Sequence, residues 1–135
     1  MSSPSKGPFD QLEGVTAISS NDIWAVGSNG KRALIEHWNG SKWSTVASPH
    51  PGKRGFSGLS DIVALSASDI WAVGVGDKVT LIEQWNGTSW SIVSSPNASK
   101  SDALSAVTQV PGTGQVWAVG QAHHKYDNTL TEFYC

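Results

Sequence analysis

The sequence predicts an all-β fold built from tandem copies of one four-stranded unit, which is the pattern of a β-propeller. The run Asp-Ile-Trp-Ala-Val-Gly occurs at residues 22–27 and again at 69–74, and a close variant returns at 116–120. A second run, Leu-Ile-Glu-x-Trp-Asn-Gly-x-x-Trp, follows the first two copies at residues 34–43 and 81–90. All 7 tryptophans of the chain occupy these repeated positions. Short apolar runs that recur about every 47 residues indicate one supersecondary unit copied along the chain.

Composition agrees with a turn-rich β protein. The 135 residues include 14 glycines and only 15% charged residues. The formal net charge of −2, without a basic block or an acidic tail, gives no field that would favour nucleic acid or a membrane surface, and we expect neither as a partner. The only cysteine, Cys135, allows no intrachain disulfide. No apolar run has the length of a membrane span or of a secretory signal, so we expect a soluble chain whose compartment the sequence does not fix.

The first two strands of each unit come from alternating and continuous apolar runs. The first strand alternates apolar and polar residues, and we place it at residues 14–19, 61–66 and 105–110. A turn rich in Ser, Asn and Asp, or in Pro and Gly in the third unit, leads to the second strand, the Ile-Trp-Ala-Val-Gly run. This run is apolar on both faces, which predicts cover on both sides. We therefore expect Trp24, Trp71 and Trp117 to pack in the core, in preference to serving as stacking platforms for sugars.

The third and fourth strands form a hairpin rich in aromatic residues. We place the third strand at residues 33–38, 80–85 and 129–134, and the fourth at 42–47 and 89–94. The Asn-Gly pairs at 39–40 and 86–87 predict two-residue type I′ turns, with tryptophans paired across the hairpin. Ser48-Pro49 and Ser95-Pro96 end the fourth strands, because proline cannot continue a ladder.

The repeat also sets the expected domain organisation. Residues 1–135 form a single fragment with blades at about 10–49, 57–96 and 102–135, the last without its fourth strand. Ser3-Pro4 matches the Ser-Pro that closes a fourth strand. Propellers typically have four to eight blades, so three blades leave two faces uncovered. We expect either a homodimer, in which two chains complete a six-bladed ring, or a piece of a longer propeller.

The two repeated motifs resemble the kelch repeat of galactose-oxidase-type propellers. In that repeat, an aromatic-bearing strand ending in glycine precedes a strand with one aromatic residue, a turn and a tryptophan. Similar tryptophan-rich repeats occur in extracellular bacterial propellers, so the resemblance implies that location. Kelch-like propellers include lectins, protein-binding adaptors and oxidases, and the resemblance therefore implies an architecture and a choice of functions.

The most variable segments of the repeat are its loops, which suggests a binding function. The loops between second and third strands and the connections between units should share one face, because hairpins alternate in direction. Dissimilar loops on a repeated framework favour a non-enzymatic module that binds carbohydrate or protein there. The alternatives are solvated loops of mixed charge and a self-assembling fragment without a ligand. The candidate binding residues are Lys31, Arg32, Lys53, Arg54, Asp77, Lys78, His123, His124 and Tyr126.

An enzymatic function has weaker support. Kelch-like copper oxidases use histidine, tyrosine and a cysteine linked to tyrosine, and here residues 123–126 (His-His-Lys-Tyr) precede Tyr134 and Cys135. Adjacent histidines diverge on an extended chain and no carboxylate supports them, so we expect no metal and no cofactor. Glu36, Glu83 and Glu132 recur once per unit, which favours a repeated structural hydrogen bond over a catalytic acid–base pair.

Overall fold

The computed structural model describes residues 2–4, 7–51, 55–97, 101–123 and 127–134. Within these residues the protein is all-β, and its strands form three small antiparallel sheets that follow one another along the chain. The predicted all-β class with antiparallel sheets is therefore confirmed. We name the three sheets sheet I, sheet II and sheet III in chain order.

Each sheet is an up-and-down meander in which sequential strands are neighbours. Sheet I contains β1 (Gln11–Ser19), β2 (Asp22–Ser28), β3 (Ala33–Trp38) and β4 (Trp43–Val46). Sheet II contains β5 (Ser57–Ser66), β6 (Asp69–Gly76), β7 (Val79–Trp85) and β8 (Trp90–Ile92). Sheet III contains β9 (Asp102–Gln109), β10 (Val116–His123) and β11 (Asp127–Tyr134). The predicted strands are all present, and the first strand of each sheet begins three or four residues earlier than the alternating pattern suggested.

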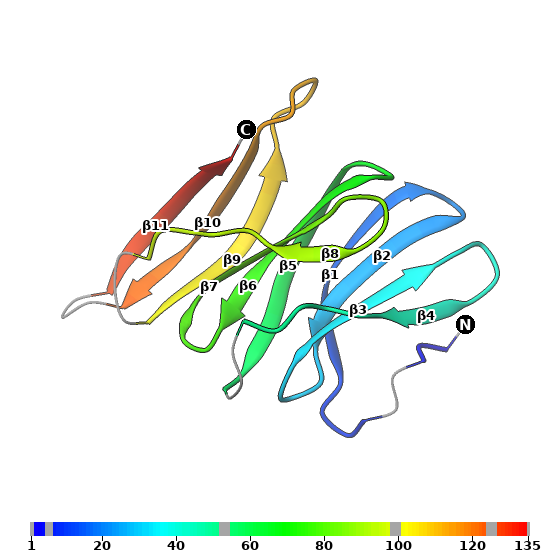
Figure 1. Ribbon diagram of the computed structural model, residues 1–135, viewed down its shortest axis with the longest axis horizontal. Coiled ribbons are helices and arrows are strands. Elements are labelled where there is room, and N and C mark those ends of the chain that lie inside the picture. The colour runs from blue at the N-terminus through cyan, green and yellow to red at the C-terminus, as the bar shows by residue number, and fades with distance from the viewer. Residues whose placement is uncertain (1, 5–6, 52–54, 98–100, 124–126, 135) are drawn as a thin grey trace.

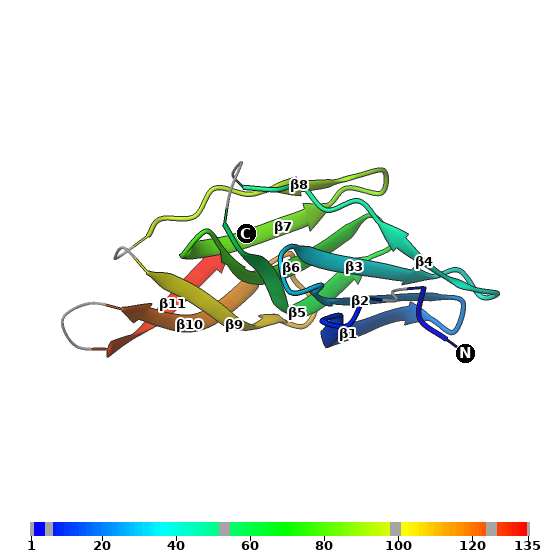
Figure 2. The same cartoon turned by 90° about the horizontal axis from the view of Figure 1, so that it is seen from below.

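The three sheets stand side by side. Figure 1 shows sheet I in blue and cyan at one end, sheet II in green in the middle, and sheet III in yellow to red at the other end. The view of Figure 2 shows the same order. The first strands β1, β5 and β9 contact one another in sequence, and β2 and β6 each contact the first strand of the next sheet. Sheet II is therefore covered on both faces, and sheets I and III on one face each.

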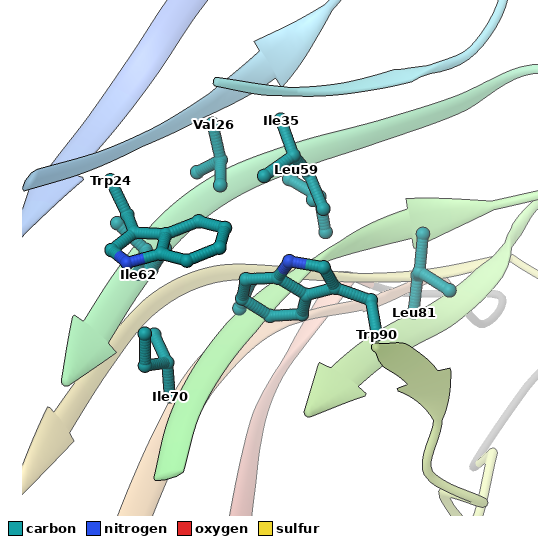
Figure 3. Packing of buried hydrophobic residues seen from close by; sticks show 9 residues of the cluster. Trp24, Val26, Ile35, Leu59, Ile62, Ile70, Leu81 and Trp90 are labelled. Carbon is teal, nitrogen blue, oxygen red and sulfur yellow. The ribbon is translucent and has the colours of Figure 1, made fainter. Parts of the chain in front are cut away.

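The hydrophobic core lies in the two junctions between sheets. At the junction of sheets I and II, Trp24 and Val26 of β2 pack against Leu59 and Ile62 of β5, and the Trp90 indole lies 5.6 Å from that of Trp24 (Figure 3). At the junction of sheets II and III, the cluster is built from corresponding positions one repeat later, with valine in place of Ile62 and Ile70. Its members are Trp71, Val73, Ile82, Leu104, Val107, Val116 and Ala118. In sheets I and II the Trp-Ala-Val run is buried because its Trp and Val face the following sheet.

The glycine that follows this run allows a close backbone approach. A β-carbon built on Gly74 would lie 2.0 Å from the carbonyl oxygen of Gly58, and one on Gly27 or Gly120 would meet the first strand just as closely. The pairing register of the first strand shifts at this point in every sheet. The bulge brings the first-strand carbonyl over the glycine, and any side chain there would displace it.

The turn chemistry differs from the prediction. The Asn-Gly pairs were expected to form two-residue type I′ turns, but Trp38 pairs with Trp43, so the loop has four residues and Asn39 has no positive φ. The Asn39 Oδ1 atom instead accepts the backbone N–H groups of Ser41 and Lys42, at 3.0 Å each. This Asx-type bonding holds Asn39 in an ordinary conformation and leaves only the glycine with positive φ. The expected pairing of tryptophans across the hairpin is confirmed, with Trp38 and Trp43 ring centroids 5.9 Å apart.

Positive φ at two successive residues occurs at a different turn. Asp77 and Lys78 have φ values of 53° and 71°, and Gly76 pairs with Val79 on either side of them. These are the features of a type I′ turn, formed here without glycine. The β6–β7 connection is therefore a tight two-residue hairpin, as short as the β5–β6 connection, in which Ser66 pairs with Asp69.

Candidate functional site

The predicted loop face exists. Backbone hydrogen bonds join each β2–β3-type loop to the connection that enters the next sheet: Ser57 N–H donates to Lys31 O at 3.1 Å, and Asp102 N–H donates to Lys78 O at 2.8 Å. Asp77 N–H also donates to Phe56 O at 2.7 Å. We call this surface, formed by residues 29–32, 48–51, 55–57, 77–78 and 93–97, the loop face. The expectation that these loops share one face is confirmed.

Four of the nine candidate binding residues, Lys31, Arg32, Asp77 and Lys78, belong to the loop face as defined above. Lys31, Asp77 and Lys78 are exposed, and Arg32 is partly buried. His123 is the last residue of β10, and its backbone N–H donates to Ser101 O at 2.8 Å. Four further candidates, Lys53, Arg54, His124 and Tyr126, lie outside the described residues. The structure thus places Lys31 and Arg32 at the junction of sheets I and II and Asp77 and Lys78 next to the following junction.

A pocket of about 220 Å³ opens beside Arg32 at the junction of sheets I and II. It is lined by Arg32, Ala33, Ser48, Pro49, His50 and Ser57. Arg32 is among the binding residues predicted from the sequence, whereas His50 is not. The available signal was its position two residues after Ser48, in a Ser-Pro segment that recurs once per unit.

One wall of this pocket belongs to a repeated serine–carboxylate contact. Ser48 Oγ donates to the Glu83 carboxylate at 2.8 Å, and Ser95 Oγ meets the Glu132 carboxylate at 2.7 Å. Ser3 Oγ donates to Glu36 Oε1 at 2.6 Å. In each case a serine that precedes proline reaches the buried glutamate of a third strand. The prediction of a repeated structural hydrogen bond is confirmed.

These buried carboxyl groups differ in their surroundings. Burial raises the pKa of Glu83 to about 7, and the hydrogen bond from Ser48 opposes part of that rise. Beside Glu132, the Tyr134 hydroxyl donates to Oε2 at 2.8 Å. Burial, together with the nearby Glu132, raises the pKa of Tyr134 to about 12. Because the serine of each pair is held by its carboxylate in three copies, the contact is part of the framework.

A second repeated polar contact anchors the buried tryptophans. Trp24 Nε1–H donates to Asp22 Oδ1 at 3.0 Å, and the same oxygen lies 2.8 Å from His37 Nε2. In sheet II, Asp69 Oδ1 accepts Trp71 Nε1–H and an amide N–H of Gln84, both at 2.9 Å. Since glutamine replaces the histidine in the second copy, the arrangement fixes the tryptophan ring and requires no proton transfer.

The outward face of sheet III carries apolar side chains that are buried elsewhere in the repeat. Trp117 is 41% exposed and Val119 is 47% exposed. Their counterparts by strand register, Trp24 and Val26 in sheet I, are buried against the next sheet. The expectation that Trp117 packs in the core like Trp24 is therefore wrong for this chain, because no described residue forms a sheet beyond sheet III. We call this surface end face III.

The outward face of sheet I is the complementary surface, which we call end face I. Leu12 is 44% exposed and Val15 is 67% exposed, whereas their counterparts Leu59 and Ile62 in sheet II are buried. A depression of about 290 Å³ opens between them. It is lined by Leu12, Glu13, Gly14, Val15, Ala25 and Trp43. The matching positions of sheet II form the site that Trp24 fills (Figure 3).

Within the described ranges, no group of three or more His, Cys, Asp and Glu side chains is arranged to hold a metal ion. The described part of the chain has no helix with the length and hydropathy needed to cross a membrane. Comparison of the sequence and structure with family models, with curated proteins and with solved structures found no match. The resemblance to kelch-like propellers thus stays a prediction based on the repeated motifs.

Proposed function

We propose that this chain is a non-enzymatic scaffold module, one half of a six-bladed β-propeller that two copies complete through their end faces. One observation carries the proposal: positions buried at both internal junctions are exposed at the two ends. Val26 and Val73 are buried while Val119 is exposed, and Ile62 and Val107 are buried while Val15 is exposed. The repeat itself therefore indicates what should cover each end.

The internal junction serves as a template for the contact between copies. Trp24 of sheet I lies against Leu59, Ile62 and Trp90 of sheet II. By register, Trp117 of one copy would occupy the depression bounded by Leu12, Val15 and Trp43 of the next. Burial of such side chains contributes roughly 1.5–3 kcal/mol each. Association of the two end faces is therefore favoured over their exposure to solvent.

Head-to-tail contacts of this kind either close into a ring or continue as a filament. Two copies with three sheets each give six blades, a number within the usual range of closed propellers. A closed dimer uses both end faces of both copies and leaves the loop face open for a ligand such as a carbohydrate or a protein. The buried serine–glutamate pairs and the aspartate–tryptophan contacts are accounted for by the framework, which favours a scaffold over an enzyme.

Charge substitutions on the two end faces test this assembly. Val15→Glu and Val119→Arg each place a charge on an exposed position, so the single chain should fold, but each should convert a dimer to a monomer in light scattering or native mass spectrometry. An equimolar mixture of the two variants should recover the dimer. In the mixed pair one contact has two unmodified end faces, and the other opposes Glu to Arg.

The control is Thr88→Glu, which adds the same charge in the exposed β7–β8 turn and should leave the mass unchanged. Circular dichroism and thermal unfolding of every variant would show that the fold is retained. A monomeric mass for the unmodified protein would contradict the assembly proposal. So would a mass that keeps growing with concentration, which would show an open filament.

A further inference from the structure

The pocket beside Arg32 contains two nitrogen atoms whose hydrogen bonding is incomplete. Among the described residues, Arg32 Nη1 and His50 Nε2 are buried and have no hydrogen-bond partner. Both side chains line the pocket of about 220 Å³ on the loop face. Buried polar groups in proteins are nearly always paired, so two unpaired nitrogens at one pocket indicate a partner from outside the chain.

Both nitrogens are hydrogen-bond donors. The Arg32 guanidinium is always protonated and has no acceptor. Ser57 Oγ accepts the backbone N–H of Ala33 at 3.0 Å, and its own hydrogen can be donated to His50 Nδ1, which lies 3.5 Å away. A histidine whose Nδ1 accepts a proton carries its hydrogen on Nε2, and a doubly protonated ring carries one there as well. With Ser57 donating to Nδ1, both Arg32 Nη1 and His50 Nε2 require an acceptor as their partner.

At the junction of sheets II and III, the corresponding polar groups need no acceptor from outside the chain. By register, Val79 replaces Arg32 and Thr80 replaces Ala33, while Asn97 stands where the first junction has His50. There Asn97 Oδ1 accepts the N–H of Thr80 at 3.1 Å and its hydroxyl at 3.0 Å. The corresponding groups of the second junction satisfy each other, so the unpaired donors are a departure from the repeat and not a requirement of the fold.

We propose that this pocket binds a carboxylate group, held between the guanidinium of Arg32 and the imidazole of His50. A carboxylate offers two acceptor oxygens, which suits two separate donors and pairs well with guanidinium. Ala33 and Pro49 supply apolar contacts for the body of a small organic acid or an acidic sugar. The Glu83 carboxyl lies behind Ser48 in the pocket wall, and its proximity disfavours a doubly charged group such as phosphate.

The site is complete within one chain, so it stands apart from the proposed ring. A titration at pH 7 with sodium acetate, sodium glucuronate and inorganic phosphate, followed by NMR of the His50 ring, tests it. Sodium chloride at equal ionic strength is the reference, and His50→Asn identifies the ring signals. We expect saturable shifts with both carboxylates and weaker binding of phosphate. Tighter binding of glucuronate than of acetate would show that the pocket also contacts the sugar.

The matched variant uses residues that the chain already carries at the second junction. Arg32→Val, alone or with Ala33→Thr and His50→Asn, should fold, because Val79, Thr80 and Asn97 occupy these positions in sheet II. The affinity for both carboxylates should fall at least tenfold, followed at the His50 ring in Arg32→Val and at the backbone amide of Ser57, which also lines the pocket, in the combined variant. Equal affinity in the variant, no saturable shift of the His50 ring, or phosphate binding as tight as that of the carboxylates would overturn the proposal. The monomeric Val15→Glu variant should retain carboxylate binding, which separates this site from ring assembly.

Discussion

Ser48 and Glu83 face each other across the junction of sheets I and II, with Ser48 Oγ 2.8 Å from one carboxylate oxygen of Glu83 and 3.0 Å from the other. Glu83 is completely buried in β7. A hydroxyl has one proton to donate, so it satisfies only part of the hydrogen-bonding capacity of an ionised carboxylate. The contact thus joins two sheets through a carboxyl group that is easier to bury when protonated.

The first prediction follows from the pKa of about 7 for Glu83 in the folded chain, raised from 4.5 chiefly by burial. Since the folded-state pKa lies above the unfolded value, the contribution of Glu83 to stability is fully present below about pH 4.5. This contribution is lost as the pH rises through 7. The free energy of unfolding should fall across this window by up to about 3 kcal/mol. Urea unfolding at a series of pH values measures it.

Glu83→Gln should remove this dependence, because the amide stays neutral and its oxygen still accepts from Ser48. At pH 8 the variant should be more stable than the parent chain by roughly 1–3 kcal/mol. Asp77→Asn, a neutralisation at an exposed turn residue, is the matched control and should leave the pH profile unchanged. A parent profile that is flat between pH 4.5 and 8 would contradict the prediction.

The second prediction concerns the glycine that follows the Trp-Ala-Val run. Gly74→Ala would place a β-carbon 2.0 Å from the carbonyl oxygen of Gly58, so β5 and β6 must separate or the chain must shift. We expect a loss of about 3 kcal/mol or more in unfolding free energy. Gly114→Ala is the control, since its β-carbon would meet no atom within 4 Å, and it should change stability little. Comparable effects at the two glycines would show that the close approach is not the cause.

The third prediction concerns the β6–β7 turn. Lys78 has a φ of 71°, a left-handed conformation that costs a non-glycine residue roughly 1 kcal/mol. Lys78→Gly should therefore raise the thermal midpoint, with a gain of up to about 1 kcal/mol. Lys42→Gly removes an equally exposed lysine from a turn position without positive φ and should be neutral or destabilising. A loss of stability in Lys78→Gly would show that the turn is not strained.

The fourth prediction separates the two roles of His37. Its ring stacks on Trp24 with centroids 4.2 Å apart, and its Nε2 lies 2.8 Å from Asp22 Oδ1. His37→Gln should keep the contact with Asp22, as Gln84 does with Asp69 in sheet II, and lose only the stacking. His37→Ala loses both, so its unfolding free energy should be lower than that of His37→Gln by about 1 kcal/mol. Equal stability would mean that the hydrogen bond contributes nothing.

Periodicity predicted the strands well because the motif of each strand occurs in two or three copies along the chain. The third strand of sheet I was placed at its observed bounds, and its glutamate, Glu36, was correctly interpreted as structural from its recurrence. The loops that share a face also followed from strand alternation. These features depend on the local residue pattern and on the recurrence of the motifs. Both can be read from a single sequence.

Features set by tertiary contacts were not predictable in the same way. Asn-Gly is a strong signal for a type I′ turn, but the Asn39 side chain bonds to its own loop and produces a four-residue connection. Trp117 occupies the same position in its motif as Trp24, and only the absence of a following sheet among the described residues leaves it exposed. His50 follows the recurring Ser-Pro segment, but only the fold shows that its ring lines a pocket with Arg32.

Because the apolar clusters lie between sheets and not within them, the molecule behaves energetically as a row of coupled neighbours. Sheet II, held from both sides, should show the slowest amide hydrogen exchange, whereas sheet III, with three described strands and one junction, should open first. Unfolding of the single chain would then proceed from one end toward the middle. A closed ring would have no such free end. Unfolding would then change from a gradual process into one cooperative transition whose midpoint depends on protein concentration.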